Sequence, residues 1–447
     1  MSTLYLPAWS IGPDCYKEVY EIVRPYGKKV AVIGGHTALS VAMPKLKAAL
    51  EGTDLELTDP IWFGGEASYE NAAMLEAMDE VKNADVIFGV GGGRAMDTAK
   101  CAAGHLNKPI FAFPTLASNC ASCTTLCVMY YPDGAMRDLY YPKRCAIHTF
   151  MDSEIIANSP AEYVWAGIGD SLAKEFESEF AARNDLAAFK IQHAPLMGTA
   201  IAKCCTSAFL HYGEKAMEQI RNHVDGYELQ QVTLGIVITA GMVSNLTVET
   251  VKNEYFYNDS IAHGFYYGCT VCPGAHKHLH GELVSMGILV LLTLFIVLNL
   301  IKSRTGRAIM SIRDNRIAAE SVGINVTKYK LIAFSVSAAL AGVAGAFYAH
   351  NFSSLVAQKF DYNTSILILV FVVLGGIGNI RGSVIAAAVL TVLPEMLRAL
   401  NTYRMLIYAV ILILVMIFSQ NEQLVLWRMR LKHKVTAAFG AHRRKGA

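Results

Sequence analysis

Short apolar runs alternate with helix-length segments along the first third of the chain. Three of the runs are Lys29–Gly35, Asp85–Val90 and Pro109–Phe113, and the first two lead into glycine turns. A strand that is apolar at successive positions is buried on both faces, as in a parallel sheet that is covered by helices on both sides. The pattern therefore predicts a doubly wound α/β domain over residues 1–158.

The rest of the chain is predicted to be helical, in two different environments. After Ser159 the strand signals fade and helical ones dominate as far as Gly281, which indicates a mainly helical second domain over residues 159–290. Beyond it, uncharged runs of membrane-spanning length predict an α-helical transmembrane region over residues 291–447. These runs are Leu283–Ile301, Leu331–His350, Tyr362–Ile380 and Met405–Asn421, with a shorter one at Gly382–Pro394.

Membrane insertion is favoured over the alternative of buried helices in a soluble domain. One such run would fit either interpretation, but four of them lie in one region. The small residues Ala338, Gly342 and Ala346 also recur at the spacing that allows close helix packing in lipid.

The charges divide the chain at about the same place. The net charge of +2 combines −11 over residues 1–287 with +13 over residues 288–447, and all ten cysteines lie in the first part. The positive-inside rule assigns the basic segment Lys302–Lys330 and the basic tail after Gln423 to the cytoplasm. Nucleic-acid binding by the tail is the less favoured alternative. The start of the chain has no signal-peptide pattern, so we expect a cytoplasmic first part with reduced thiols.

A glycine turn followed by a helix is the first sign of chemistry. The string Gly91–Lys100 has three consecutive glycines and lies where a predicted strand meets a predicted helix. Glycines let backbone N–H groups approach a pyrophosphate, and the helix presents its positive end to it. Such a turn alone is weak evidence for nucleotide binding.

The wider motif set is far more specific. Gly91–Lys100, Pro114–Thr124 and Asp152-Ser153 together resemble the iron-containing alcohol dehydrogenase family, particularly its glycerol dehydrogenase branch. The resemblance implies an α/β nucleotide-binding domain of the dehydroquinate synthase-like type, followed by an α-helical metal-binding domain. It also implies a homo-oligomer that oxidises a small polyol, such as glycerol to dihydroxyacetone, by hydride transfer to NAD.

The same resemblance implies the site residues. Asp170, His263 and His280 match the family's metal ligands, and we expect them to be the catalytic centre. The metal is zinc or, alternatively, iron (Zn2+ or Fe2+). One carboxylate and two imidazoles leave open positions for substrate oxygens. The residues expected to contact NAD are Gly92, Gly93, Asp97, Thr115, Ser118, Thr124, Leu126, Val128 and Tyr130.

Two positions depart from the family pattern. Many relatives carry an acidic residue after the first strand, whereas this chain has Gly35-His36, which leaves NAD against NADP open. Cys120 stands where glycerol dehydrogenases place an aspartate near the substrate. Cysteine metal sites are a less favoured alternative, and they would use Cys120, Cys123 and Cys127, or Cys269 and Cys272 with His276 and His278.

The basic segment carries a second resemblance. Ser303–Asn315, followed by Gly323-Ile324-Asn325 and then by Leu374–Gly382, resembles the C-terminal half of a branched-chain amino-acid ABC transporter permease. In that family the cytoplasmic loop, here residues 302–330, contacts the ATPase subunit. The resemblance therefore implies an ATPase partner and a location in the cell inner membrane.

The two resemblances meet within Leu289–Leu294, and each is incomplete. The dehydrogenase part, to about residue 292, lacks its closing helices, and the permease part, from about residue 291, lacks its front half. A span over Leu283–Ile301 with a cytoplasmic loop after it would also put the dehydrogenase on the side away from its cofactor. Local and global signals usually agree in a natural sequence. We therefore hypothesise a chimera, in which neither activity need be intact.

Overall fold

The computed structural model describes residues 4–249, 255–271, 278–351, 362–376 and 378–396. The chain divides into two compact units, Met1–Tyr329 and Lys330–Ala447. Its strands are β1 (Ala8–Ile11), β2 (Lys29–Gly34), β3 (Glu56–Leu57), β4 (Ile61–Trp62), β5 (Val86–Val90), β6 (Ile110–Phe113), β7 (Cys127–Tyr130), β8 (Met136–Tyr140) and β9 (His148–Met151).

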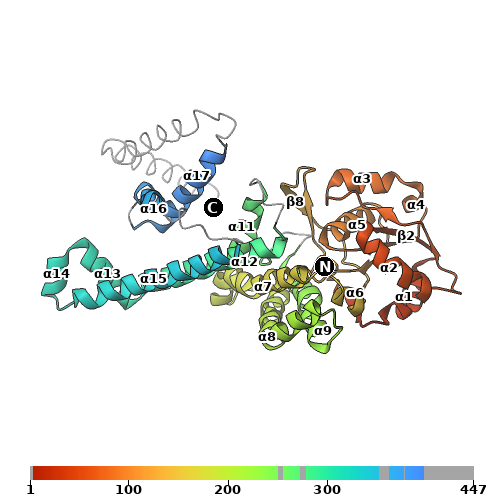
Figure 1. Ribbon diagram of the computed structural model, residues 1–447, viewed down its shortest axis with the longest axis horizontal. Helices are drawn as coiled ribbons and strands as arrows, with labels where there is room; N and C mark the ends of the chain where they lie inside the picture. Colours follow the sequence, from red (N-terminus) through yellow and green to blue (C-terminus); the bar gives the residue numbers. More distant parts are fainter. Residues whose placement is uncertain (1–3, 250–254, 272–277, 352–361, 377, 397–447) are drawn as a thin grey trace, which may run out of the picture. The chain divides into compact units, whose positions relative to one another are not determined.

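Helices make up most of the remaining described structure (Figure 1). They are η1 (Cys15–Glu18), α1 (Val19–Val23), η2 (Arg24–Tyr26), α2 (His36–Ala49), α3 (Tyr69–Ala77), α4 (Asp79–Lys82), α5 (Gly93–His105), α6 (Ser153–Ala157), α7 (Ala161–Ala187), α8 (His193–Arg221), α9 (Tyr227–Leu234), η3 (Gly235–Thr239), α10 (Ala240–Thr247), α11 (Ile261–Cys269), α12 (His280–Lys302), α13 (Arg304–Asp314), α14 (Arg316–Ser321), α15 (Val326–Asn351), α16 (Tyr362–Gly375) and α17 (Ile380–Met396).

The first unit is built on a parallel sheet, as the apolar runs predict. The strand order is β1-β9-β6-β5-β2-β3, and β4 also pairs with β2. The three predicted strands are its neighbouring central strands β6, β5 and β2. Alternate residues enter separate cores: Val30 and Val32 pack with α1 and α2, whereas Ala31 and Ile33 pack with α3 and α5. Burial on both faces explains why these strands are apolar at every position after Lys29, the exposed first residue of β2.

A helical layer follows the sheet, in agreement with the prediction for the second domain. Helices α7 to α10 share one hydrophobic core. The segment Tyr227–Thr247 within it is long and apolar enough to cross a membrane, but 72% of its most apolar window is buried in this core. Hydropathy alone therefore overstates the membrane character of this segment.

Helix α12 packs on α7 and α11 through small residues. A Cβ atom added to Gly281 would lie 1.8 Å from the carbonyl oxygen of Ala166, and one added to Gly287 would lie 2.5 Å from the Cα atom of Ala262. Burial along the helix continues to Leu291, which is 5% exposed. Four large apolar side chains beyond it are exposed, namely those of Leu292, Phe295, Ile296 and Leu298. The start of α12 thus belongs to the first unit's core, and its end does not.

The predicted membrane spans agree with the helices of the structure to different degrees. Helix α12 and Val326–Ala346 of α15 are long and apolar enough to cross a membrane. The prediction of one helix over Tyr362–Ile380 is wrong, because α16 ends at Gly375 and α17 begins at Ile380. The backbone turns between them, where Gly376 has a φ of 93°. The shorter run Gly382–Pro394 lies in α17, and Met405–Asn421 lies outside the described residues.

Replacing Gly281 with alanine should loosen α12 from α7. The added methyl group overlaps the Ala166 carbonyl, and overpacking of this kind costs about 1–3 kcal/mol. Thermal unfolding should therefore begin at a lower temperature in Gly281→Ala. The control is Gly213→Ala in α8, where a Cβ atom meets nothing within 4 Å and helix propensity predicts a small gain in stability. Equal melting temperatures for the two variants would contradict the close packing.

Candidate active site

A cavity of about 500 Å³ lies between the sheet and the helical layer of the first unit. One wall is the carboxyl edge of the sheet, with Gly91–Gly93 after β5 and residues 116–128 after β6. The opposite wall comes from α7, α11 and α12. The volume suits a small-molecule site, and the carboxyl ends of parallel strands are where open α/β folds bind ligands.

The glycine turn leaves backbone N–H groups available at the start of α5. Gly91 has a φ of 134°, a conformation that side chains with a Cβ atom rarely adopt. The helix begins at Gly93, and no side chain caps it. A Cβ atom on Gly93 would lie 2.5 Å from the Nδ2 atom of Asn119. The turn therefore combines close approach with an uncapped helix N-terminus, as a pyrophosphate site requires.

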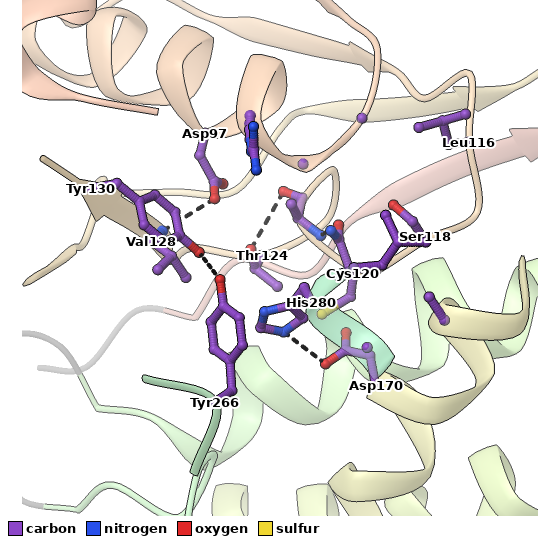
Figure 2. A pocket seen from close by; sticks show the side chains of 18 of the residues that line it. Asp97, Leu116, Ser118, Cys120, Thr124, Val128, Tyr130, Asp170, Tyr266 and His280 are labelled. Carbon is purple, nitrogen blue, oxygen red and sulfur yellow. Dashed lines mark hydrogen bonds and ion pairs between the residues drawn. The ribbon is translucent and has the colours of Figure 1, made fainter. Parts of the chain in front are cut away.

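Lys100 is fully buried and organises the loop opposite this turn. Its Nζ atom donates to the carbonyl oxygens of Ala121 at 2.6 Å and Leu126 at 2.7 Å. It also pairs with the Asp97 Oδ1 atom at 3.0 Å, and the Oδ2 atom of Asp97 accepts from the Val128 N–H at 3.1 Å (Figure 2). Burial raises the pKa of Asp97, and the Lys100 ammonium opposes that rise. Asp97 thus shapes the loop as well as facing the cavity.

Most of the residues predicted to contact NAD line the cavity. They are Gly92, Gly93, Asp97, Ser118, Thr124, Leu126, Val128 and Tyr130. Thr115 is buried and is not part of the cavity wall. The Tyr130 and Tyr266 hydroxyls bond to each other at 2.7 Å, and Figure 2 shows the two side chains pointing toward one another. This contact joins β7, on the sheet side of the cavity, to α11.

The three predicted metal ligands come together although they lie on three helices. Asp170 is on α7, His263 on α11 and His280 in the first turn of α12. One ligand atom from each lies within 4.8 Å of the others. The Nε2 atom of His280 is 3.1 Å from the Asp170 Oδ1 atom, and that of His263 is 3.3 Å from the same oxygen. Tyr266 packs edge-on against the His280 ring at 4.2 Å.

The charges around these ligands fit a divalent cation. The side chains of Asp170, Glu177 and Asp259 are at most 7% exposed, and Lys174 is the neighbouring buried cation. With the neutral imidazoles that metal binding requires, the three carboxylates and the Lys174 ammonium sum to −2, a costly charge to bury without a cation. Burial favours neutral His263, but Asp259 and Glu177 raise the pKa of His263 to about 10. Burial also opposes ionisation of Asp170, yet both imidazoles hold its pKa well below the ordinary value.

Cysteines contribute no metal cluster in the described part of the chain. The groups of three or more potential ligands found there contain only His, Asp and Glu. Cys120 lines the cavity, and burial raises its pKa to about 11, so it is a neutral thiol. Cys272 and His276 of the alternative site lie outside the described residues. His36, which follows the first predicted strand where many relatives carry an acidic residue, stacks on Trp62 with ring centroids 5.4 Å apart.

Four polar residues around the cluster were not predicted from the sequence: Lys174, Glu177, Asp259 and Tyr266. Lys174 donates to the Asn258 Oδ1 atom at 3.1 Å and lies 3.5 Å from the Asp259 Oδ1 atom. A local signal existed for two of them, because Asp170, Lys174 and Glu177 follow one another at i, i+4 and i+7 on one helix face. Buried polar residues at this spacing indicate a site within a helical core.

Two family models match the chain. The iron-containing alcohol dehydrogenase model matches residues 7–153. The model of the branched-chain amino acid transport system permease component matches residues 223–416. The second match begins in the helical layer, well before the end of α12.

Known proteins divide between the same two groups. Glycerol dehydrogenase of Escherichia coli O6:H1 is 30% identical over 284 residues, which cover 63% of this chain and 74% of that protein. Glycerol dehydrogenase of Thermotoga maritima is 34% identical over 227 residues, which cover 51% of this chain and 59% of that protein. A high-affinity branched-chain amino acid transport system permease protein of Salmonella typhimurium is 37% identical over 153 residues. These cover 34% of this chain and 36% of that protein. The chain thus spans little more than a third of that permease's length.

The fold has solved counterparts for the dehydrogenase part. The glycerol dehydrogenase structure from Schizosaccharomyces pombe superposes with a TM-score of 0.57 at 26% identity. The match covers 66% of this chain and 72% of that one. The likeness therefore includes helices of the second layer as well as the sheet.

Removing the Lys100 charge should disorganise the nucleotide side of the cavity. Lys100→Met leaves the Asp97 carboxyl buried without its partner, which costs about 3–5 kcal/mol for a buried pair. We expect a lower melting temperature and loss of NADH binding, measured by fluorescence titration. Lys108→Met is the control, since its Nζ atom bonds carbonyl oxygens near the surface. NADH binding that survives Lys100→Met would contradict the assigned role.

Proposed function

The N-terminal part of this chain belongs to the iron-containing alcohol dehydrogenase family, and on that premise we propose that it oxidises a small polyol, such as glycerol, with NAD. The observation that carries the proposal is the convergence of Asp170, His263 and His280 beside the glycine turn, within one cavity. The three side chains are the proposed catalytic centre and metal ligands. The sequence-based boundaries, 1–158 and 159–290, are the proposed nucleotide and metal domains.

Each side of the cavity has a proposed role. The uncapped N-terminus of α5 binds the pyrophosphate, and the loop held by Lys100 positions the nicotinamide. A divalent cation, zinc or iron, would lower the energy of an alkoxide when bound. Asp170 supplies the negative charge for that cation, and the two imidazoles supply neutral donors. The Tyr130–Tyr266 contact helps to exclude water from the hydride path.

Cys120 bears on the substrate. A neutral thiol at this position adds no negative charge to the cavity, unlike the aspartate of glycerol dehydrogenases. The nearby buried ammonium of Lys174 pairs with the Asp259 carboxylate at 3.5 Å. We propose a small vicinal diol as the substrate class.

A second proposed function belongs to residues 291–447. Helix α12 and α15 carry exposed apolar surfaces: α12 is 17% buried over its most apolar window, and the window in α15 is 0% buried. Between them, α13 and α14 form a basic helical pair, capped where Ser303 accepts from Gly306 N–H and Asn315 accepts from Ala318 N–H. We infer that this part inserts into the inner membrane and that loop 302–330 meets an ABC ATPase. Under the chimera hypothesis, the dehydrogenase part and the permease part are pieces of two different proteins joined in one chain.

The dehydrogenase proposal predicts chelator-sensitive NADH formation from glycerol or 1,2-propanediol. Asp170→Asn should lower kcat/KM by about a thousandfold or more, because a catalytic metal contributes several kcal/mol. Asp185→Asn, on the same helix but bonded to Tyr257, is the matched control and should retain activity. A folded, zinc-loaded chain that forms no NADH from any small alcohol would contradict the proposal.

The membrane proposal predicts that the full chain stays in the membrane fraction after carbonate washing. The segment Val326–Ala346 of α15 is long and apolar enough to cross a membrane, and none of its most apolar window is buried, which favours a hydrocarbon environment. Co-purification with an ATPase should follow if loop 302–330 keeps its contact. Recovery of the chain only in the soluble fraction would count against insertion.

A further inference from the structure

Glu177 is a buried carboxylate whose two oxygens are both engaged with one short segment. It lies on α7, and its side chain has no exposed area. The Oε1 atom accepts from the backbone N–H groups of Ser260 and Ala262 at 2.8 Å each, and of His263 at 3.1 Å. The Oε2 atom contacts the Nδ1 atom of His263. The carboxylate therefore holds both the backbone and the ring of His263.

The backbone contacts cap helix α11. This helix begins at Ile261, and its own N-cap residue, Ser260, makes no side-chain capping bond. The first N–H groups of a helix need external acceptors, and a negative charge there also interacts favourably with the helix dipole. Glu177 supplies both from a different helix. The start of α11, and so the position of His263 along it, depends on this one side chain.

The ring contact determines which nitrogen of His263 can bind a metal. An ionised carboxylate only accepts hydrogen bonds, so the Nδ1 atom of His263 carries the proton and donates the hydrogen bond to Glu177. The Nε2 atom is then left with its lone pair when the ring is neutral. That atom lies 3.3 Å from the Asp170 Oδ1 atom, on the side of the metal cluster. Carboxylates behind a ligating imidazole orient the ring and raise its basicity.

We propose that Glu177 is the positioning residue of the metal site: it caps α11 and holds His263 in the tautomer that directs Nε2 at the metal. The role rests on the metal site of the proposed function. Glu177, Asp259 and His263 also form a group of potential ligands, so a second cation is the alternative. The bonds already made to Oε1, and the Lys174 ammonium 3.5 Å from Asp259, disfavour a cation there.

The test measures zinc affinity by competition with a chromogenic chelator, using the full chain in detergent. Glu177→Gln should bind zinc about 10- to 100-fold more weakly than the wild type. Glu179→Gln is the matched control on the same helix, because Glu179 is partly exposed and pairs with Lys203. NADH affinity should be unchanged in both variants. An affinity for zinc within twofold of the wild type in Glu177→Gln would overturn the positioning role alone.

A double-mutant cycle separates positioning from general destabilisation. Once His263 is replaced by alanine, Glu177→Gln should weaken zinc binding no further. A purely structural effect of Glu177→Gln would instead add its own loss of zinc affinity to the loss caused by His263→Ala. Additive losses would overturn the proposal. Absence of zinc binding by the wild type would instead overturn the proposed function together with it.

The wild-type protein offers a readout that needs no variant. Histidine 15N spectra of the zinc-loaded chain should show His263 protonated at Nδ1 and metal-bound at Nε2. The opposite assignment would overturn the proposal even if Glu177→Gln failed to fold.

Discussion

Helix α12 has to satisfy two environments whose requirements overlap along its length. From His280 to Leu291 it packs into the dehydrogenase part, through contacts such as Gly281 on Ala166. The remaining apolar segment, Leu292–Ile301, reaches only about 15 Å at 1.5 Å per residue, half of a hydrocarbon core of about 30 Å. The longer run Leu283–Ile301 reaches about 28 Å. A full span would therefore take in the very turns that complete the enzyme core.

The convergence of Asp170, His263 and His280, the proposed metal ligands, depends on the outcome of this competition. The donors lie on α7, α11 and α12, and only the last of these helices faces a rival environment. If the start of α12 moved into lipid, His280 would leave the cavity, and Asp170 would lose one of the two imidazoles that hold its pKa low. Buried carboxylates that lose compensating groups destabilise a fold strongly. In the structure, α12 makes its contacts with the dehydrogenase part from His280 to Leu291, and only the residues after Leu291 are left free to enter a membrane.

Sequence patterns reveal the elements whose signal is local, such as a run of apolar residues. The strands β2, β5 and β6 were predictable because burial on both faces leaves an apolar residue or glycine at every position except Lys29, the exposed first residue of β2. The edge strand β1, its neighbour β9 and the β7–β8 hairpin were missed, because their residues are mixed in polarity. The pairing of β1 with β9 also joins segments about 140 residues apart in the sequence. The break at Gly376 was missed because glycine does not interrupt an apolar run. The resemblance supplied the three predicted ligands, but the capping role of Glu177 depends on contacts between helices α7 and α11, where Glu177 and His263 lie 86 residues apart in the sequence.

Helix α12 should stay docked on the dehydrogenase part, so that His280 remains beside Asp170 and His263 even when the chain is in a membrane. X-ray absorption spectroscopy of the zinc-loaded chain in lipid nanodiscs tests this directly, because imidazole ligands can be counted from multiple scattering. We expect two imidazoles in the wild-type chain, falling to one in His280→Ala. A single imidazole in the wild-type chain would contradict it, since α12 would then have left the enzyme for the bilayer.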